Sequence, residues 1–241
     1  MKIFQILLIL MSIVFNKEQP QKKIDGSYYD KYGEEIIIKR DRFILDLHQT
    51  APFYGTDKIA TCKISRINDE LIEINSETPR ERQLKAQSSL TIRQSYDPDL
   101  KDSIRVEIRI KEHSLIYSEI LANFDSSLSY LTSSNFDKQY SKKYHINEGF
   151  VSVTLPGDIK RLFSVYFEPE RIPYEGLDPI YRGYAYQSIS LDTIVEEGKN
   201  VIKISVPAID GGYFQQYYVK GEYVRIKENS LIWRGIEYKK K

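Results

Sequence analysis

The sequence predicts an all-β fold, an antiparallel barrel and/or β-sandwich with little helix outside an N-terminal leader. Short segments with an apolar residue at every second position recur along the chain, which is the spacing of strands with one buried face. Turn-forming residues separate these segments, and no window holds a convincing amphipathic helix longer than about three turns. Strands repeated at such short spacing are typical of sandwiches and barrels.

A hairpin is predicted at residues 33–45, where Ile36 and Ile38 share one face of a strand and Phe43 and Leu45 share a face of the returning strand. Residues 221–233 repeat the device, with identical pairs Gly33/Gly221, Glu34/Glu222, Ile38/Ile226, Lys39/Lys227 and Ile44/Ile232. The repeat indicates either a duplicated architecture or two hairpins that follow the same local rules independently. Because one hairpin lies near each end of the chain, the terminal strands are expected to pair and close the sheet.

A chain of 241 residues can form one large all-β domain or two small ones, and its 41% apolar residues can supply a core. The formal net charge is +1, and removal of a leader that carries Lys2 would leave equal numbers of acidic and basic residues. A balanced charge gives no electrostatic footprint for nucleic acid, so no nucleic-acid partner is predicted.

Residues 1–15 contain one early lysine followed by a continuous apolar run. The run is short for a membrane span and is typical of a secretory signal peptide, although a buried strand is the alternative. We expect an exported protein, located in the periplasm, on the outer surface or outside the cell, with no transmembrane segment in its mature form. Residues 16–23 are polar and are predicted to be a linker.

Cys62 is the only cysteine, so no intramolecular disulfide can form. It lies in the alternating segment 59–64, which predicts that the thiol points inward as a small hydrophobic group. A reactive thiol is the alternative.

About five strands are expected over residues 24–76, followed by a charged connector at 77–87 that lacks periodic apolar positions. Further strands are expected at 90–92, 103–110, 115–124, 144–156, 162–167, 187–191, 201–206 and from 213 onward. Residues 125–143 are ambiguous, and a short helix is an option there. The Pro- and Gly-rich stretch 168–186 predicts a long surface loop.

The opening Gly26-x-Tyr28, the hairpin up to Leu45 and the strand at 68–76 resemble lipocalin-like secreted proteins of Bacteroidetes. This resemblance implies a small antiparallel barrel that is often exported. Two departures are visible. Tyr28 stands where such barrels usually carry tryptophan, and the middle of the chain is longer than theirs.

The middle, roughly 102–167, is similar in outline to carboxypeptidase-regulatory-like β-sandwiches. The match is carried by residues 147–156, with a glycine, an aromatic residue, an alternating strand and a closing proline. Both resemblances are satisfied by a barrel made from 24–80 together with 187–241, into which a sandwich segment at 81–186 is inserted. One continuous β domain over 24–241 is the alternative.

No catalytic residue, metal site or cofactor is predicted. His48, His113 and His145 stand alone, and the sequence holds no nucleophile elbow, phosphate-binding glycine loop or dinucleotide fingerprint. Carboxylates from distant strands could still pair as they do in glycoside hydrolases.

The candidate ligand-binding residues lie in the Pro- and Gly-rich loop: Tyr174, Tyr181, Arg182, Tyr184 and Tyr186. Rigid aromatic rings beside adaptable polar groups suit the binding of sugars or peptides. A second aromatic cluster comprises Tyr213, Phe214, Tyr217 and Tyr218. The alternative for both clusters is that the rings cap the ends of the core.

The absent motifs, the leader and the balanced charge together favour a non-enzymatic, exported β protein that binds a ligand or partner at the cell envelope. The expected partner is a glycan, a lipid or an envelope protein. Two other functions stay open: a glycan-active hydrolase on a β-scaffold, and a structural or adhesion component of the cell surface.

Overall fold

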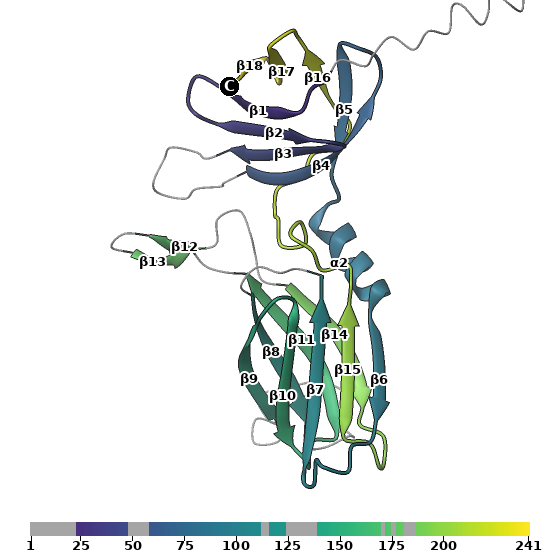
Figure 1. Ribbon diagram of the computed structural model, residues 1–241. Coiled ribbons are helices and arrows are strands. Elements are labelled where there is room, and N and C mark those ends of the chain that lie inside the picture. The colour runs from purple at the N-terminus through teal and green to yellow at the C-terminus, as the bar shows by residue number, and fades with distance from the viewer. Residues whose placement is uncertain are drawn as a thin grey trace, which may run out of the picture.

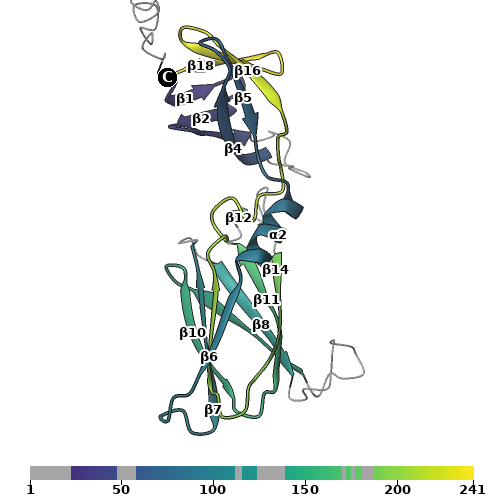
Figure 2. The same cartoon turned by 90° about the vertical axis from the view of Figure 1, so that its right-hand side faces the viewer.

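The computed structural model describes residues 23–47, 58–111, 116–123, 139–169, 172–174, 177–180 and 187–241. These residues form a β-barrel and a β-sandwich stacked end to end, with one helix beside the waist between them (Figure 1, Figure 2). The predicted all-β fold class is confirmed. The predicted signal peptide at 1–15 lies outside the described residues.

The barrel is closed, eight-stranded and antiparallel. In order around the ring its strands are β1 (Gly26–Tyr29), β18 (Ile236–Lys240), β17 (Ser230–Trp233), β16 (Glu222–Ile226), β5 (Leu71–Asn75), β4 (Lys58–Arg66), β3 (Arg42–Leu47) and β2 (Glu35–Lys39). Tyr28 on β1 lies opposite Lys240 on β18, so the first and last strands close the ring as expected. This is the architecture that the lipocalin-like resemblance implies.

Side chains fill the interior of the barrel. Ile36, Ile38, Phe43 and Leu45 point inward and are at most 2% exposed, which confirms the strand faces predicted for the first hairpin. Trp233 packs edge-on against Phe43, with ring centroids 6.5 Å apart. A small eight-stranded barrel has an interior just wide enough for such packing, so this core stabilises the fold.

The sandwich consists of two four-stranded sheets. One sheet has the order β10 (Phe150–Pro156), β7 (Ser103–Ile110), β15 (Val201–Val206) and β6 (Thr91–Ser95), and the other has the order β14 (Gln187–Ile194), β11 (Arg161–Pro169), β8 (Ile116–Asn123) and β9 (Gln139–Ile146). Apolar residues such as Val106, Val165 and Ile189 are fully buried between the sheets.

The sequence places residues 187–206 with the barrel, whereas the structure places them in the sandwich. Strand β14 pairs with β11, and β15 pairs with both β6 and β7. Ile202 and Ile204 on β15 are thereby buried in the sandwich core. The long loop predicted at 168–186 also contains a short hairpin, formed by β12 (Ile172–Tyr174) and β13 (Leu177–Ile180).

The connector predicted at 77–87 is wrong, because residues Pro79–Ser89 form helix α2. Thr78 and Glu81 make a reciprocal capping box, and Pro79 occupies the first turn, where its missing N–H costs nothing. Only Arg82 and Ala86 of this helix are buried, so it has no apolar stripe by which the sequence could reveal it. No helix in the described part of the chain has the length and apolarity that a membrane crossing requires.

Two glutamine side chains hold α2 and β6 against the edge of β14. Gln87 donates to the Ser190 carbonyl over 2.8 Å and accepts from the Ser190 N–H over 3.0 Å. Gln94 donates to the Ile194 carbonyl over 2.8 Å and accepts from the Glu196 N–H over 3.0 Å. These amides satisfy backbone groups that an edge strand leaves open, and they fix the helix on the sandwich.

Candidate functional site

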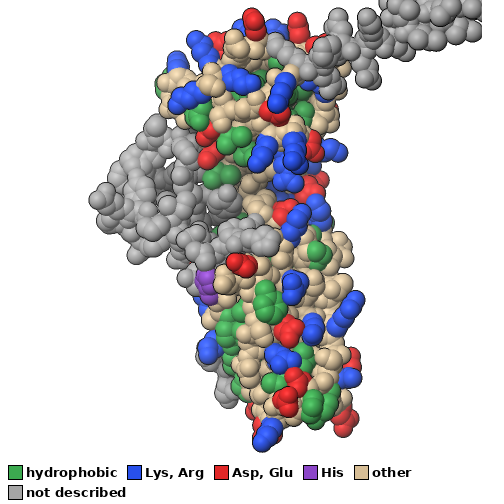
Figure 3. Space-filling view, viewed as in Figure 1, with side chains coloured by type: hydrophobic (Ala, Val, Ile, Leu, Met, Phe, Trp, Pro, Cys, Tyr) green, Lys and Arg blue, Asp and Glu red, His purple; other side chains and the backbone are tan. Residues whose placement is uncertain are grey.

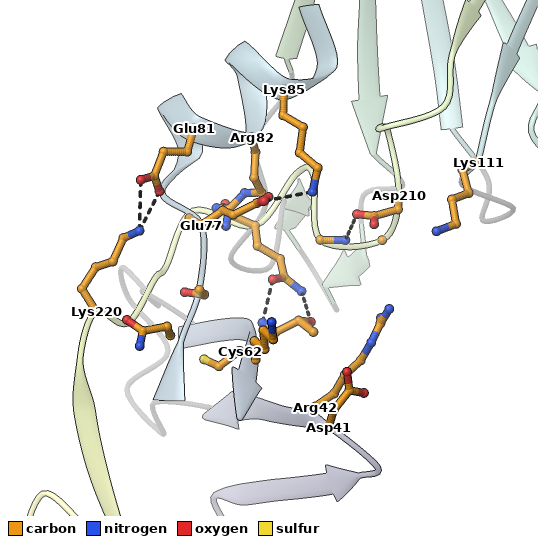
Figure 4. A pocket seen from close by; sticks show the side chains of 17 residues that line it. Asp41, Arg42, Cys62, Glu77, Glu81, Arg82, Lys85, Lys111, Asp210 and Lys220 are labelled. Atoms are coloured by element: carbon orange, nitrogen blue, oxygen red, sulfur yellow. Dashed lines mark hydrogen bonds and ion pairs between the residues drawn. The ribbon is translucent and has the colours of Figure 1, made fainter. Parts of the chain in front are cut away.

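A cleft of about 1040 Å³ lies at the waist between the barrel and the sandwich. Its wall combines the start of β3, the middle of β4, the end of β5, one side of α2, and the loop at 210–215 (Figure 4). The wall carries six cationic and four acidic side chains, and none of the described residues that line it is aromatic. Lys and Arg side chains, with acids among them, gather around this waist in the space-filling view (Figure 3).

Arg82 of α2 holds the two sides of the waist together. Arg82 is 6% exposed, and its guanidinium donates to the backbone carbonyls of Glu77 and Gln215. Burial lowers the pKa of this guanidinium, although the neighbouring carboxylates oppose that effect. Since Gln215 lies 133 residues away in the sequence, these hydrogen bonds tie the helix to the returning chain.

Gln215 continues the link into the barrel. Its side-chain oxygen accepts from the Thr61 N–H over 2.9 Å, and its amide donates to the Thr61 hydroxyl over 3.1 Å. The two crossing segments also bind one another directly, because the Ser76 N–H donates to the Val219 carbonyl over 2.8 Å. The cleft is therefore framed by hydrogen bonds between the helix, the barrel and the loop that returns from the sandwich.

Two ion pairs occupy the helix side of the cleft. Lys85 lies 2.9 Å from Glu77, and Lys220 lies 2.8 Å from Glu81. The hydrogen bonds from Lys220 and from the Thr78 backbone lower the pKa of Glu81 to about 2. Glu81 thus stays ionised and paired at neutral pH.

The barrel side of the cleft carries cations without such partners. Arg42 on β3 and Lys63 on β4 lie directly opposite each other and are both exposed. Lys111, which follows β7, is exposed on the sandwich side, and Figure 4 shows its side chain and that of Arg42 pointing into the same space. Across the residues that the structure describes, none of these three cations has an ion-pair partner.

Cys62 is one of the residues at the wall of the cleft and is fully buried, which confirms the inward orientation predicted for it. Burial raises the pKa of its thiol to about 12. The thiol is therefore protonated at neutral pH and is a poor nucleophile.

The predicted aromatic site is largely outside the described residues. Tyr181, Arg182, Tyr184 and Tyr186 are not described, and Tyr174 is described only as a backbone position of β12, paired with Leu177. These residues stay a prediction.

The second aromatic cluster is placed by the structure. Tyr213 and Phe214 are 2% and 3% exposed in the sandwich core, with an edge-on ring contact of 5.0 Å. For these two rings the core-capping interpretation is confirmed. Tyr218 is 46% exposed.

Only one of the three histidines lies in the described part of the chain. His145 lies on β9, whereas His48 and His113 lie outside the described residues. Within the described ranges, no group of three His, Cys, Asp or Glu side chains could hold a metal ion.

The cleft itself was not predicted from the sequence. The outward orientation of Arg42 could have been read from its place next to the buried Phe43. The meeting of Arg42 with Lys63 depends on strand register, and the meeting of Arg82 with Gln215 depends on tertiary packing. Neither contact leaves a local sequence signal.

No protein-family model matches the chain, and neither the curated proteins nor the solved structures contain a match. Function is therefore inferred from the geometry of the site.

Proposed function

We propose that this chain is an exported, non-enzymatic protein that binds a ligand or partner at the cell envelope, and that the cleft at the waist is its binding site. Export rests on the signal-peptide pattern of residues 1–15. The expected partner is a glycan, a lipid or an envelope protein.

The main support for this proposal is the set of hydrogen bonds that joins the helix, the barrel and the returning loop around the cleft. Three separate parts of the chain meet there, and Arg82 and Gln215 hold them through one buried and two partly buried hydrogen bonds. A concave site of several hundred Å³ between two units, held before a ligand arrives, is a common form of binding site. Preorganisation also lowers the entropy cost of binding.

The chemistry of the wall favours binding over catalysis. The Cys62 thiol is buried and protonated, and the carboxylates of Glu77 and Glu81 are each held by a lysine. A general acid or base needs a pKa near the working pH, whereas the pKa of Glu81 is lowered to about 2.

A thermal-shift screen of the purified protein against glycans, lipids, peptidoglycan fragments and small anions tests the proposal. A ligand at a hundredfold excess over its dissociation constant stabilises the folded state by about 2.7 kcal/mol, so a hit raises the melting temperature. Turnover of chromogenic glycosides would instead support a hydrolase.

A bulky substitution at the cleft tests whether a ligand found in the screen binds there. Asp41 is an exposed turn residue at the cleft, so Asp41→Trp should abolish the shift without unfolding the protein. Asp99 is an exposed turn residue at the far end of the sandwich, and Asp99→Trp is the matched control. A shift that survives Asp41→Trp would place the binding site elsewhere.

A further inference from the structure

A row of cations crosses three neighbouring strands on the outer face of the barrel. Lys39 lies opposite Arg42, and Arg42 lies opposite Lys63. All three side chains are exposed, and within the described ranges none of them has an ion-pair partner. Like charges in directly opposite positions destabilise a sheet, so this arrangement works against the stability of the free protein.

The acids of the cleft do not neutralise the row. Glu77 and Glu81 are paired with lysines on the helix side, and one Asp210 carboxylate oxygen accepts the Gly212 N–H over 3.1 Å. Asp41 lies beside Arg42 (Figure 4), without an ion pair to it among the described contacts. Asp41 and Asp210 each keep one negative charge, but six cationic side chains against four acidic ones still leave the cleft with an excess of two positive charges.

Lys111 supplies a further cation from the opposite wall. Its backbone N–H donates to the Ile209 carbonyl over 3.1 Å, which fixes the start of its side chain on the sandwich. Arg42 and Lys63 belong to the barrel. An anion that reaches both walls would therefore contact cations that the fold holds apart.

We propose that Arg42, Lys63 and Lys111 bind a small polyanion that carries two or more carboxylate or phosphate groups, an inference that rests on the proposed binding function. One anionic group lies on the Arg42–Lys63 pair, where the guanidinium offers a bidentate fork and the ammonium a point charge. A second group reaches Lys111. The described wall has no aromatic platform, so the ligand is recognised by charge and hydrogen bonds and not by stacking.

Isothermal titration of the purified protein at low ionic strength tests this inference, with citrate and pyrophosphate as probes and acetate as a single-charge comparison. Citrate, pyrophosphate or both should bind more tightly than acetate, and the tighter of the two identifies the anionic group that the site prefers. Each lost charge-assisted hydrogen bond should weaken binding roughly tenfold, so Arg42→Ala/Lys63→Ala should lower the affinity about a hundredfold. Lys111→Ala should weaken citrate and pyrophosphate about tenfold and leave acetate unchanged.

The matched control is Arg93→Ala/Lys203→Ala, which removes a directly opposed cation pair from the sandwich. Binding should survive in this control. An equal loss of affinity in both double variants would mean non-specific electrostatic attraction and would overturn the inference. Failure of both citrate and pyrophosphate to bind would also overturn it.

The outcome also separates this inference from the proposed function. A neutral ligand that Asp41→Trp blocks, with no binding of either anion, would overturn the polyanion site and leave the binding cleft intact. If no compound of either screen binds, both proposals fail.

Discussion

The barrel and the sandwich each place two cations directly opposite one another on adjacent strands. The two pairs differ in the residue that lies beside them on the next strand. On the sandwich, Arg93 of β6 faces Lys203 of β15, and the next residue across is Glu107 of β7, 3.4 Å from the Lys203 ammonium. On the barrel, Arg42 faces Lys63, and the next residue across is the neutral Asn75. The sandwich row contains its own counter-charge, whereas the barrel row does not.

The difference shows why net charge is a poor guide to partners. The whole chain is close to neutral, which argued against an electrostatic footprint. Neutrality is a sum over the chain, and it conceals a local excess where register brings like charges together. The sandwich row holds one acidic side chain, Glu107, beside its two cations, whereas the barrel row holds none next to Arg42 and Lys63.

The largest expected effect concerns Arg82, the buried cation that ties helix α2 to the returning chain at Gln215. Arg82→Ala leaves the buried carbonyl of Gln215 without its donor, and should lower the free energy of unfolding by about 3 kcal/mol. Urea denaturation measures this change. Lys85→Ala is the control, since it removes only an exposed ion pair and should cost about 0.5 kcal/mol or less. A loss below about 1 kcal/mol for Arg82→Ala would mean that the waist is held by other contacts.

Local pattern predicted the strands of both regions better than it predicted how they meet. The alternation of Ile104, Val106, Ile108 and Ile110 placed β7 at the bounds that the structure has. Helix α2 was missed, because its buried face consists of an arginine and an alanine. Strands β14 and β15 belong to the sandwich and not to the barrel with which the sequence groups them, since alternation shows that a strand has a buried face and not which partner covers it.

The candidate site was less predictable than the fold for the same reason. Its frame joins Thr61, Arg82 and Gln215, which are far apart in the sequence and carry no motif. The aromatic residues that stood out in the sequence are, for Tyr213 and Phe214, part of the sandwich core. Aromatic residues are easy to recognise in a sequence. Cations without a nearby acid can be recognised only when the strand register is known.

The next effect concerns the sandwich row, in which Lys203 lies between Glu107 and Arg93. Glu107 lies 3.2 Å from Arg105 and 3.4 Å from Lys203, so Glu107→Gln removes both ion pairs and exposes the cations to one another. The free energy of unfolding should fall by about 1 kcal/mol, and added salt should reduce the loss. A double-mutant cycle with Lys203→Met isolates the coupling of this pair. If Glu107→Gln is neutral at low salt, the counter-charge has no energetic role.

The converse change supplies the barrel row with a counter-charge. Lys63→Glu places a carboxylate opposite Arg42, and should raise the free energy of unfolding by about 0.5 kcal/mol. The same variant should lose binding of citrate and pyrophosphate. Lys63→Gln, the neutral control, should give part of the stability gain. High salt should reduce the differences in the free energy of unfolding among these variants. A less stable Lys63→Glu protein would show that the row is not repulsive.

The smallest effect concerns pH at the helix side of the cleft. The Lys220 hydrogen bond and the Thr78 backbone lower the pKa of Glu81 from its usual 4.5 to about 2. A carboxyl with a lowered pKa in the folded state binds its proton more readily when unfolded. Its contribution to stability is therefore present above pH 4.5 and is lost as the pH falls toward about 2. The stability difference between the native protein and Glu81→Gln should shrink over this window.

NMR titration of the Glu81 carboxyl measures the same property directly, and Lys220→Met removes the largest cause of the shift. That variant should move the titration of Glu81 upward toward 4.5. If Glu81 already titrates near 4.5 in the unaltered protein, its ion pair with Lys220 is not held in solution. Glu81 would then be a free acid at the cleft, able to attract Lys63 or Lys111, and the contrast between a compensated helix side and an uncompensated barrel side would weaken.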